Sequence, residues 1–425
     1  MANARKTAVK ALLQVEKSGA YSNLTLNKLL SESEHSSADR ALATALFYGV
    51  LDRKITLDYV LSSFLSKPIK RLSPYTAAVL RSALYQIMYM ERIPNSAAVN
   101  EAVKLIKASK EKFNASFVNG VLRNILRSEI NLPKDDSISS LSVRFSCPES
   151  IVESFISDYG ADTAKELLRS FLEAPPVVLQ VNTLRTNAVS LAEKLLNEGT
   201  AASVSEDGNT LVVTDGIDVR ASKCYREGLF FIQDNASRRA IEKMAPRMGE
   251  RVLDLCAAPG GKSFAAARLM QGKGEIYSFD LYEKRVELIA LSAKRLGFEN
   301  IKAAVGDATV YNGDIGTFDA VICDVPCSGL GVLRRKPEIK YKSEQEWDAL
   351  PALQLEILEN AARYLKENGR ILYSTCTLRH SENQKVTNKF LDKHTCFALK
   401  YEHTYMPHID ETDGFYCALL EKKGN

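Results

Sequence analysis

The strongest constraint on the fold is a regular alternation of two patterns in the second half of the chain. Five short apolar runs are separated by stretches with helical periodicity, and these runs are residues 251–256, 275–280, 301–305, 320–323 and 370–374. Continuous apolar runs of this length are typical of strands that are buried on both faces. The alternation therefore predicts an α/β fold with a doubly wound parallel sheet and helices on both of its faces.

A further, all-helical domain is predicted at the front of the chain, because 425 residues exceed what one core usually encloses. Residues 1–135 show apolar residues at helical spacing and almost no strand pattern. Ser73-Pro74 is expected to be the N-cap and first residue of a helix that includes residues 77–90. The polar, turn-prone segment 131–137 predicts a linker that ends this domain.

The residues between the linker and the alternating region have a mixed pattern. Two helical segments, at 149–158 and 161–173, precede short strand-like runs at 177–181, 211–213 and 229–232. We therefore expect a small α+β domain over residues 140–245, which leaves residues 246–425 for the sheet domain.

Charge is unevenly distributed along the chain. The formal net charge is +4, but residues 1–130 contain 19 Lys and Arg against 10 Asp and Glu, a charge of +9 that leaves −5 for the rest. A basic domain favours a polyanionic partner such as nucleic acid. The alternative is that these lysines only keep a helical domain soluble, and charge alone leaves both interpretations open.

The cysteines and the apolar segments exclude several classes of protein. The eight cysteines lie scattered without Cys-x-x-Cys pairs, at positions 147, 224, 256, 323, 327, 376, 396 and 417, so we expect neither a disulfide framework nor a metal site. No apolar run approaches the roughly 18 residues that span a bilayer. The start of the chain lacks the apolar segment of a secretory signal, so we expect a cytoplasmic protein without a membrane partner.

A ligand site is predicted where the first strand of the alternating region ends. That strand is followed by a turn of small residues and a helix start, Cys256-Ala257-Ala258-Pro259-Gly260-Gly261-Lys262. Paired glycines let backbone approach a ligand closely, and a helix N-terminus offers free N–H groups. The turn is not a phosphate-binding P-loop, because that motif requires glycine where Cys256 stands.

Acidic residues end the next two strands. Asp280 follows Gly261 by 19 residues, the place where nucleoside-binding folds position a carboxylate on ribose hydroxyls. Asp307 ends the third strand and is expected to bond an adenine amino group. Either aspartate by itself is more often a cap or turn residue. Together with the glycine turn they predict an adenosyl ligand without phosphates.

Two cysteines directly follow the last two strands of the alternating region. Cys327 stands in Asp324-Val-Pro-Cys-Ser-Gly and Cys376 in Tyr-Ser-Thr-Cys-Thr. Ligands in open α/β folds bind beyond the carboxyl ends of the strands, so thiols at this edge are candidates for covalent chemistry. The alternative, a small buried hydrophobe, is the interpretation that we prefer for the cysteines at 256, 323, 396 and 417.

These motifs resemble those of a known family, the S-adenosylmethionine-dependent RNA cytosine-C5 methyltransferases. The resemblance rests on Cys256 to Lys262, on Asp324 to Gly329 and on Ser374-Thr-Cys376. Residues 40–50 and 95–103 are similar to the helical RNA-binding domain of NusB-like antitermination factors. This combination of domains is similar to the bacterial Sun/Fmu type.

The resemblance implies an architecture and a cofactor. It implies an all-α NusB-like domain over 1–135, the small α+β domain over 140–245 and a Rossmann-like, seven-stranded methyltransferase domain over 246–425. S-adenosylmethionine is expected to bind at Cys256, Ala257, Ala258, Pro259, Gly260, Gly261, Lys262, Asp280, Arg285, Asp307 and Asp324.

The resemblance also implies a reaction. Cys376 is expected to attack C6 of a cytosine, Cys327 to assist removal of the C5 proton and release of the product, and Asp324 to contact the base. The implied substrate is a cytosine of 16S rRNA, position 967 by resemblance, in naked RNA or in a small-subunit assembly intermediate. We expect a cytoplasmic monomer without metal.

Two alternatives remain open from the sequence. One is a non-catalytic RNA-binding or assembly factor on the same scaffold, which predicts damaged motifs. The other is a cytosine-C5 methyltransferase that acts on tRNA or DNA. Arg334-Arg335-Lys336 is interpreted either as a phosphate-binding loop or as a solvated turn. Glu382-Asn383-Gln384 departs from the Glu-Asn-Glu that many relatives carry, which leaves the role of its carboxylates open.

Overall fold

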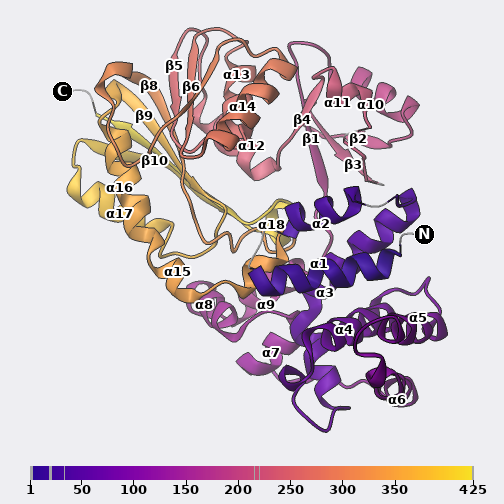
Figure 1. Ribbon diagram of the computed structural model, residues 1–425. Coiled ribbons are helices and arrows are strands. Elements are labelled where there is room, and N and C mark those ends of the chain that lie inside the picture. The colour runs from indigo at the N-terminus through magenta and orange to yellow at the C-terminus, as the bar shows by residue number, and fades with distance from the viewer. Residues whose placement is uncertain (1–2, 19–21, 33, 215, 220, 424–425) are drawn as a thin grey trace. The chain divides into compact units, whose positions relative to one another are not determined.

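The structure is a computed structural model that describes residues 3–423 apart from 19–21, 33, 215 and 220 (Figure 1). The chain divides into two compact units, residues 1–173 with 333–342 and residues 174–332 with 343–425. These units follow contacts within the chain, and the three domain boundaries expected from the sequence stay a prediction.

The first unit is helical, as predicted. Its helices are α1 (Ala4–Ser18), α2 (Ser22–Ser31), α3 (Ser37–Ser62), α4 (Pro74–Tyr89), α5 (Asn95–Lys107), α6 (Ala115–Arg127), α7 (Ile138–Phe145), α8 (Glu149–Tyr159) and α9 (Ala161–Ser170). Ser73 caps α4 as expected, because its hydroxyl accepts the backbone N–H of Thr76 at 3.1 Å. The apolar stripes of α1 to α6 pack into one core around residues such as Phe47 and Leu80.

A segment from late in the sequence completes this unit. Residues 333–342 contain a short 3₁₀ helix, η4 (Pro337–Tyr341), and Lys340 places its ammonium 2.7 Å from Asp52 of α3. Only 1% of the Lys340 side chain is exposed. A buried cation is tolerated only with such a partner, so this ion pair anchors the segment to α3. Arg334, Arg335 and Lys336 belong to the same segment, and their contact with phosphates stays a prediction.

The second unit contains a small antiparallel sheet in the order β2-β3-β1-β4. Its strands are β1 (Val177–Val181), β2 (Ala202–Val204), β3 (Thr210–Val213) and β4 (Phe230–Ile232), with α10 (Ala188–Asn197) and α11 (Lys223–Arg226) beside them. Leu179 and Val181 of β1 and Leu191 and Leu195 of α10 are fully buried together. The strands expected at 177–181, 211–213 and 229–232 are therefore confirmed.

The larger sheet of this unit has seven strands in the order β10-β11-β9-β8-β5-β6-β7. Its parallel strands are β5 (Arg251–Asp254), β6 (Glu275–Asp280), β7 (Ile301–Val305), β8 (Phe318–Asp324) and β9 (Leu365–Thr375). These are the five strands that the alternation predicts. The last two, β10 (Phe397–Tyr405) and β11 (Phe415–Lys422), form an antiparallel pair beside β9, where the sequence pattern alone located no strand.

Helices cover both faces of the larger sheet (Figure 1). Val252 of β5 packs in one apolar cluster with residues of α12 (Asn235–Met244), α13 (Gly261–Leu269) and α14 (Glu283–Leu296). Leu253, the next residue, packs in another with α16 (Leu350–Ala362) and α17 (Gln384–Lys393). The unit also contains the short helices α15 (Glu344–Asp348) and α18 (Pro407–Asp410). Neighbouring residues of a strand point to opposite faces, so each strand needs apolar residues throughout.

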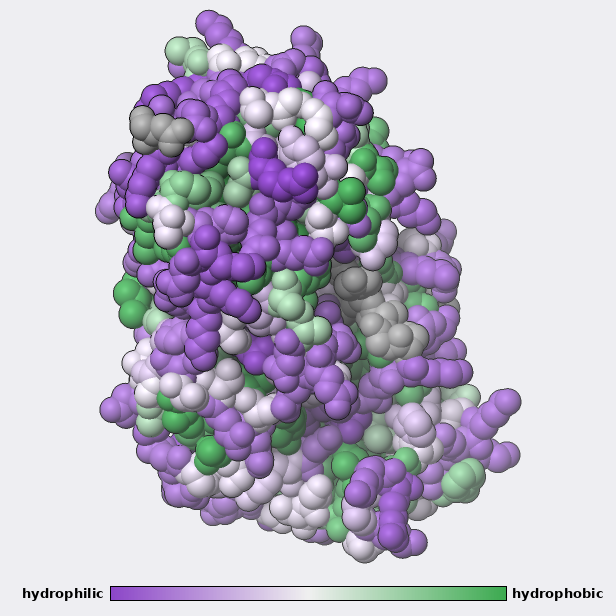
Figure 2. Space-filling view, turned by 90° about the vertical axis from the view of Figure 1, so that its left-hand side faces the viewer, coloured by the Kyte–Doolittle hydropathy of each residue, from purple (hydrophilic) through white to green (hydrophobic). Residues whose placement is uncertain are grey.

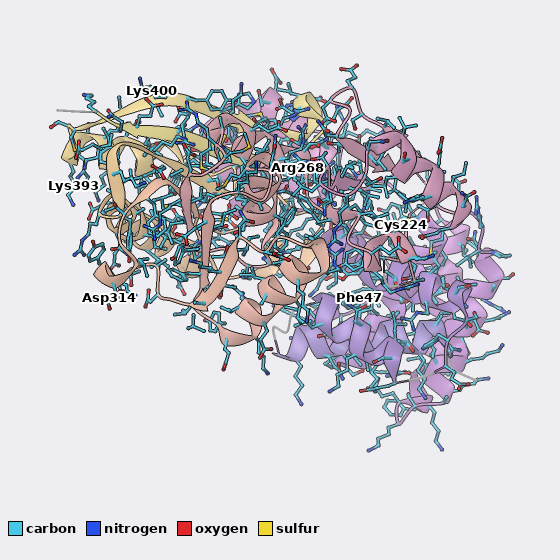
Figure 3. All side chains as sticks on the ribbon, turned by 90° about the horizontal axis from the view of Figure 1, so that it is seen from above. Phe47, Cys224, Arg268, Asp314, Lys393 and Lys400 are labelled. Atoms are coloured by element: carbon cyan, nitrogen blue, oxygen red, sulfur yellow. The ribbon has the colours of Figure 1, made fainter. Side chains whose placement is uncertain are left out.

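Charged residues lie mainly at the periphery of the second unit. Lys393 and Lys400 point outward, whereas Arg268 of α13 lies inside the unit (Figure 3). Arg268 is 5% exposed and donates to the carbonyl oxygen of Val181, so it connects α13 to the small sheet. Figure 2 shows mostly hydrophilic residues on the face that it draws, with apolar residues in small groups between them. Among the described residues, no helix is long and apolar enough to cross a membrane.

The strand order creates a crevice at the carboxyl ends of β5 and β8. The order reverses between β5 and β8, so their outgoing connections run to opposite faces of the sheet. A crevice forms at the carboxyl ends of the strands at such a point, and ligands of open α/β folds bind there. The turns that follow β5, β6, β7, β8 and β9 all meet at this edge.

Gly331 lies where two backbone segments cross near this edge. Its N–H donates to the carbonyl oxygen of Cys376 at 2.9 Å, and its own carbonyl accepts the N–H of Gly414 at 2.9 Å. A Cβ on Gly331 would lie 2.0 Å from the carbonyl oxygen of Gly414, a backbone atom that cannot turn away. Glycine is therefore required at position 331 for close approach.

We predict that Gly331→Ala lowers the thermal unfolding midpoint, because overpacking of this kind costs about 1–3 kcal/mol. Gly120→Ala in α6 is the matched control, since a Cβ there meets nothing within 4 Å. The same change in this helix interior is expected to stabilise by about 0.5–1 kcal/mol. Circular dichroism melts of both variants measure the effect, and equal shifts of the same sign would contradict the prediction.

Candidate active site

The two candidate thiols lie side by side at the carboxyl ends of β8 and β9. Parallel pairing sets Asp324 of β8 opposite Ser374 of β9, so Cys327 and Cys376 follow this pair by three and two residues. Their sulfur atoms are 3.2 Å apart, neither cysteine forms a disulfide, and both side chains are half-buried. The structure therefore brings together the two cysteines that the sequence singled out, 49 residues apart.

The Cys327 thiol has a raised pKa. The hydrogen bond with Cys376, followed by burial, raises the pKa of the Cys327 thiol well above its ordinary value of 9.0. The negative charges of Glu382 and Asp324 act in the same direction. Cys327 therefore holds its proton more tightly than an ordinary cysteine. The contact between the two sulfur atoms also allows a proton to pass from one to the other.

Asp324 is fixed at the end of β8 by two partners. The hydroxyl of Ser374 donates to Oδ1 at 2.8 Å, and the ammonium of Lys262 lies 2.7 Å from Oδ2. Lys262 also sits 4.9 Å from the centre of the Phe415 ring, and its side chain is 10% exposed. The predicted cofactor turn and the predicted base-contacting residue thus share one ion pair. Whether Asp324 contacts a base, a cofactor or both stays a prediction.

The turn between β5 and α13 has the close backbone approach that the sequence indicated. Gly260 has φ +107°, and a Cβ there would lie 2.2 Å from the ring of Phe264, so only glycine fits. The N–H of Ala257 donates to the carbonyl oxygen of Phe279 at 2.7 Å, which attaches the turn to β6. No side chain caps the N-terminus of α13, which leaves backbone N–H groups of its first turn available to a ligand.

Asp280 ends β6, as predicted, whereas β7 ends at Val305 and Asp307 follows it by two residues, in the turn after the strand. Asp280 is 5% exposed, accepts the N–H of Tyr282 at 3.2 Å and lies 3.8 Å from the guanidinium of Arg285. Asp307 is exposed and accepts both the N–H and the hydroxyl of Thr309 on one oxygen, and these bonds lower its pKa. The carboxylates lie at the same edge as the glycine turn, and their contacts with a ligand stay a prediction.

Sequence reasoning missed Asp254, which lies under the cofactor turn at the end of β5. Its Oδ2 accepts the hydroxyl of Ser263 at 2.7 Å, and Ser263 also contacts the hydroxyl of Ser278 at 2.8 Å. The side chain is fully buried, and burial raises its pKa to about 7. The available signal was an acidic residue inside an apolar run, because such a residue needs polar partners in the fold.

Sequence reasoning also missed the polar residues that join the two thiol turns. The hydroxyls of Ser328 and Thr377, the residues directly after the two cysteines, are 2.7 Å apart and buried. Glu382 accepts the N–H and the hydroxyl of Ser328. Asn383 donates to the carbonyl oxygen of Thr377, Gln354 donates to Glu382, and all three side chains are buried. A serine and a threonine after cysteine carry no signal by themselves, because these residues are common in turns.

The geometry fits an adenosyl cofactor and defines a class of protein. The turn accepts only glycine at position 260, and the first turn of α13 offers backbone N–H groups beside it. With the buried carboxylate of Asp280, these groups are suited to a nucleoside with a charged amino-acid tail. Among the described residues, no group of three or more His, Cys, Asp or Glu is arranged to hold a metal ion. With this seven-stranded sheet, the site is that of an S-adenosylmethionine-dependent methyltransferase.

Comparisons with known proteins identify the family. The family model "16S rRNA methyltransferase RsmB/F" matches residues 241–421, the NusB family matches 2–127, and a ferredoxin-like domain of RsmF/B-like methyltransferases matches 147–220. The chain therefore belongs to the RsmB/F family of methyltransferases, with a NusB-like helical domain and a ferredoxin-like domain before the catalytic sheet.

Relatives of full length support this assignment. The probable ribosomal RNA small subunit methyltransferase B of Bacillus subtilis is 36% identical, and the match covers 99% of each chain. Ribosomal RNA small subunit methyltransferase B of Proteus mirabilis is 30% identical, again over 99% of each. The crystal structure of PH0851 has a TM-score of 0.84 at 27% identity and covers 99% of both chains.

We predict that Asp254 makes stability depend on pH. Its pKa is about 7 in the folded protein against an ordinary value of 3.8, so the folded state holds the proton more tightly. The resulting contribution to the free energy of unfolding is complete below about pH 4 and is lost as pH rises through about 7. Asp254→Asn cannot ionise, so the variant should gain stability relative to the wild type across this range.

Urea unfolding at a series of pH values measures this difference. Asp307→Asn is the control, because the pKa of Asp307 is lowered and its contribution is lost as pH falls, which is the opposite sign. A difference between Asp254→Asn and the wild type that does not change with pH would contradict the prediction.

Proposed function

We propose that this protein transfers a methyl group from S-adenosylmethionine to C5 of one cytosine in 16S rRNA, position 967 by resemblance. The observation that carries the proposal is the pair of sulfur atoms of Cys327 and Cys376, 3.2 Å apart beside the fixed carboxylate of Asp324. The names of the relatives, ribosomal RNA small subunit methyltransferase B, support the choice of substrate.

A thiolate is needed because C5 of cytosine is a poor nucleophile. The sulfur of Cys376 forms a bond with C6, the C5–C6 double bond opens, and its electron pair makes C5 reactive. When bound, S-adenosylmethionine supplies an electrophilic methyl group to that carbon. The raised pKa of Cys327 fits its proposed role as the thiol that carries a proton, and Cys376 is proposed as the sulfur that attacks.

The second thiol serves the release of the product. After methyl transfer, C5 carries both a proton and a methyl group, and Cys376 is still bound to C6. We propose that Cys327 gives its proton to the departing sulfur of Cys376 and takes up the C5 proton, while the electrons of the C5–H bond restore the C5–C6 double bond. Both cysteines end as thiols, and Cys376 loses its proton to water before the next cycle.

Asp324 and Lys262 orient the base during this sequence. A carboxylate can accept the N4 amino group of cytosine, and the neighbouring ammonium neutralises negative charge that develops as the thiolate adds. Their mutual distance of 2.7 Å and the hydrogen bond from Ser374 keep both groups in place without a substrate. Positioned groups of this kind contribute roughly 10²–10⁴-fold to the rate.

The helical unit supplies the RNA contact in this proposal. Residues 1–130 carry 19 basic against 10 acidic residues, and the NusB family matches the same part of the chain. A cytosine in a loop or single strand is the form that a protein can extract and capture. We propose a monomer that acts in the cytoplasm on naked 16S rRNA or on an assembly intermediate of the small subunit.

We predict opposite effects for the two cysteines. Cys376→Ala should abolish both methyl transfer and the covalent adduct with RNA, because no sulfur then reaches C6. Cys327→Ala should leave a covalent RNA adduct that persists in denaturing gels, because release is blocked after attack. Cys396→Ala is the control and should behave as the wild type, because Cys396 is exposed, and the expectation of a buried hydrophobe at this position was wrong. The reverse pattern would exchange the two roles.

We predict that 5-methylcytosine disappears from one position of 16S rRNA when the gene is deleted. Bisulfite sequencing of 16S rRNA, tRNA and genomic DNA from cells with and without the gene measures the change. The wild-type gene should restore the mark, and the Cys376→Ala gene should not. An unchanged 16S rRNA map, or a loss confined to tRNA or DNA, would refute the proposed substrate.

A further inference from the structure

A fully buried carboxylate lies behind the turn that carries Cys327. Glu382 has no exposed surface, and its Oε2 accepts the backbone N–H of Ser328 at 2.8 Å. Its Oε1 accepts the Ser328 hydroxyl at 2.6 Å. Ser328 directly follows Cys327, so both oxygens of Glu382 hold the residue next to the thiol. Two hydrogen bonds to one residue fix its position and its orientation.

The same hydroxyl connects this turn to the turn of Cys376. The single proton of the Ser328 hydroxyl goes to Glu382, so Ser328 accepts from the hydroxyl of Thr377, 2.7 Å away. Thr377 directly follows Cys376. The chain Glu382 to Ser328 to Thr377 therefore spans the two residues that neighbour the reacting sulfurs.

Asn383 holds the Cys376 turn from the other side. Its Oδ1 accepts the hydroxyl of Thr375 at 2.6 Å, and its Nδ2 donates to the carbonyl oxygen of Thr377 at 3.0 Å. Asn383 therefore bonds the residues directly before and directly after Cys376. Two adjacent residues, Glu382 and Asn383, thus each hold one of the thiol turns.

Glu382 is itself fixed by groups from three other parts of the chain. Gln354 of α16 donates from Nε2 to Glu382 Oε2 at 3.0 Å and to the carbonyl oxygen of Pro326 at 2.9 Å. The Tyr373 hydroxyl donates to the carbonyl oxygen of Glu382 at 2.6 Å, and Arg379 lies 3.6 Å from Oε1. All partners of the two carboxylate oxygens are donors, so the hydrogen-bonding needs of this buried side chain are met.

The geometry points to Glu382 as a positioning residue for the release step: its carboxylate sets the distance and direction of the Cys327 thiol relative to Cys376. This inference rests on the proposed function, in which Cys327 gives its proton to the departing sulfur. A proton transfer of this kind needs the two sulfurs in hydrogen-bond contact, and their 3.2 Å separation depends on how the two turns are held.

The third residue of the Glu382-Asn383-Gln384 segment has no part in this arrangement. Gln384 directs its Nε2 to the hydroxyl of Thr404 in β10, at 3.3 Å, and its contact lies outside both thiol turns. The first carboxylate of the segment therefore carries the role, and a carboxylate at position 384 is not required for it.

The test is the amount of covalent RNA adduct formed by Glu382→Gln in the full-length protein. An amide keeps the shape of the side chain but replaces one acceptor oxygen by a donor, so Ser328 loses one of the two acceptors that hold it. We expect the adduct with a 16S rRNA fragment to accumulate in denaturing gels, as it does with Cys327→Ala. Turnover should fall at least about tenfold, while KM for RNA stays within about threefold.

Gln384→Glu is the matched control, since it alters the same segment without touching the thiol turns and should behave as the wild type. Glu382→Asp should recover part of the turnover, because a carboxylate remains. Ser328→Ala covers the case in which Glu382→Gln does not fold, since it removes only the hydroxyl between Glu382 and Thr377 and should also accumulate adduct. Circular dichroism and cofactor binding confirm that each variant is folded.

Two results separate this inference from the proposed function. If Cys327→Ala accumulates adduct while folded Glu382→Gln and Ser328→Ala release product at the wild-type rate, the role of Glu382 is overturned and the thiol chemistry stands. If Cys327→Ala forms no adduct, the assigned thiol roles fail and this inference fails with them. Loss of adduct formation in Glu382→Gln, as in Cys376→Ala, would also overturn it.

Discussion

Parallel pairing of β8 with β9 is the constraint on which the site depends. The pairing sets Asp324 opposite Ser374, and the two strands then end in turns that present Cys327 and Cys376 to each other. A shift of the register by one residue would move every side chain of a strand to the other face of the sheet. Strand burial on both faces holds the register, because the apolar clusters on each side accept only one alignment.

The edge of the sheet gathers many polar groups, and the fold tolerates them because most have partners. Lys262 neutralises Asp324, and Glu382 is surrounded by donors. Asp254 differs, since its side-chain partner is the hydroxyl of Ser263 and not a cation, and burial raises its pKa. At this edge, Asp324 and Glu382 have donors as partners, and Asp254 has a raised pKa. Such fixed groups suit a reaction in which charge develops and disappears on a base.

The helical unit and the sheet unit were predicted to different degrees. The helices and the five parallel strands followed from periodicity, because each repeats a pattern within one segment. The antiparallel pair β10 and β11 did not, since its placement depends on pairing with β9. Nor did the sequence indicate that residues 333–342 belong to the helical unit. Lys340 and its partner Asp52 lie 288 residues apart, and no local pattern encodes such a contact.

The sequence by itself determined the kinds of residue at each strand end: the glycine turn, Asp280, Asp307, Asp324 and the two cysteines. Local motifs encode these residues, because the type of a residue and its position after a strand both follow from one short segment of the sequence. Only the tertiary structure decided which groups meet, such as the two sulfurs, Lys262 with Asp324, and Glu382 with Ser328. It also raises the pKa of Cys327, through the contact with Cys376 and through burial. Distance, burial and neighbouring charge arise from the packing of distant segments, and these quantities turn a set of residue types into a site.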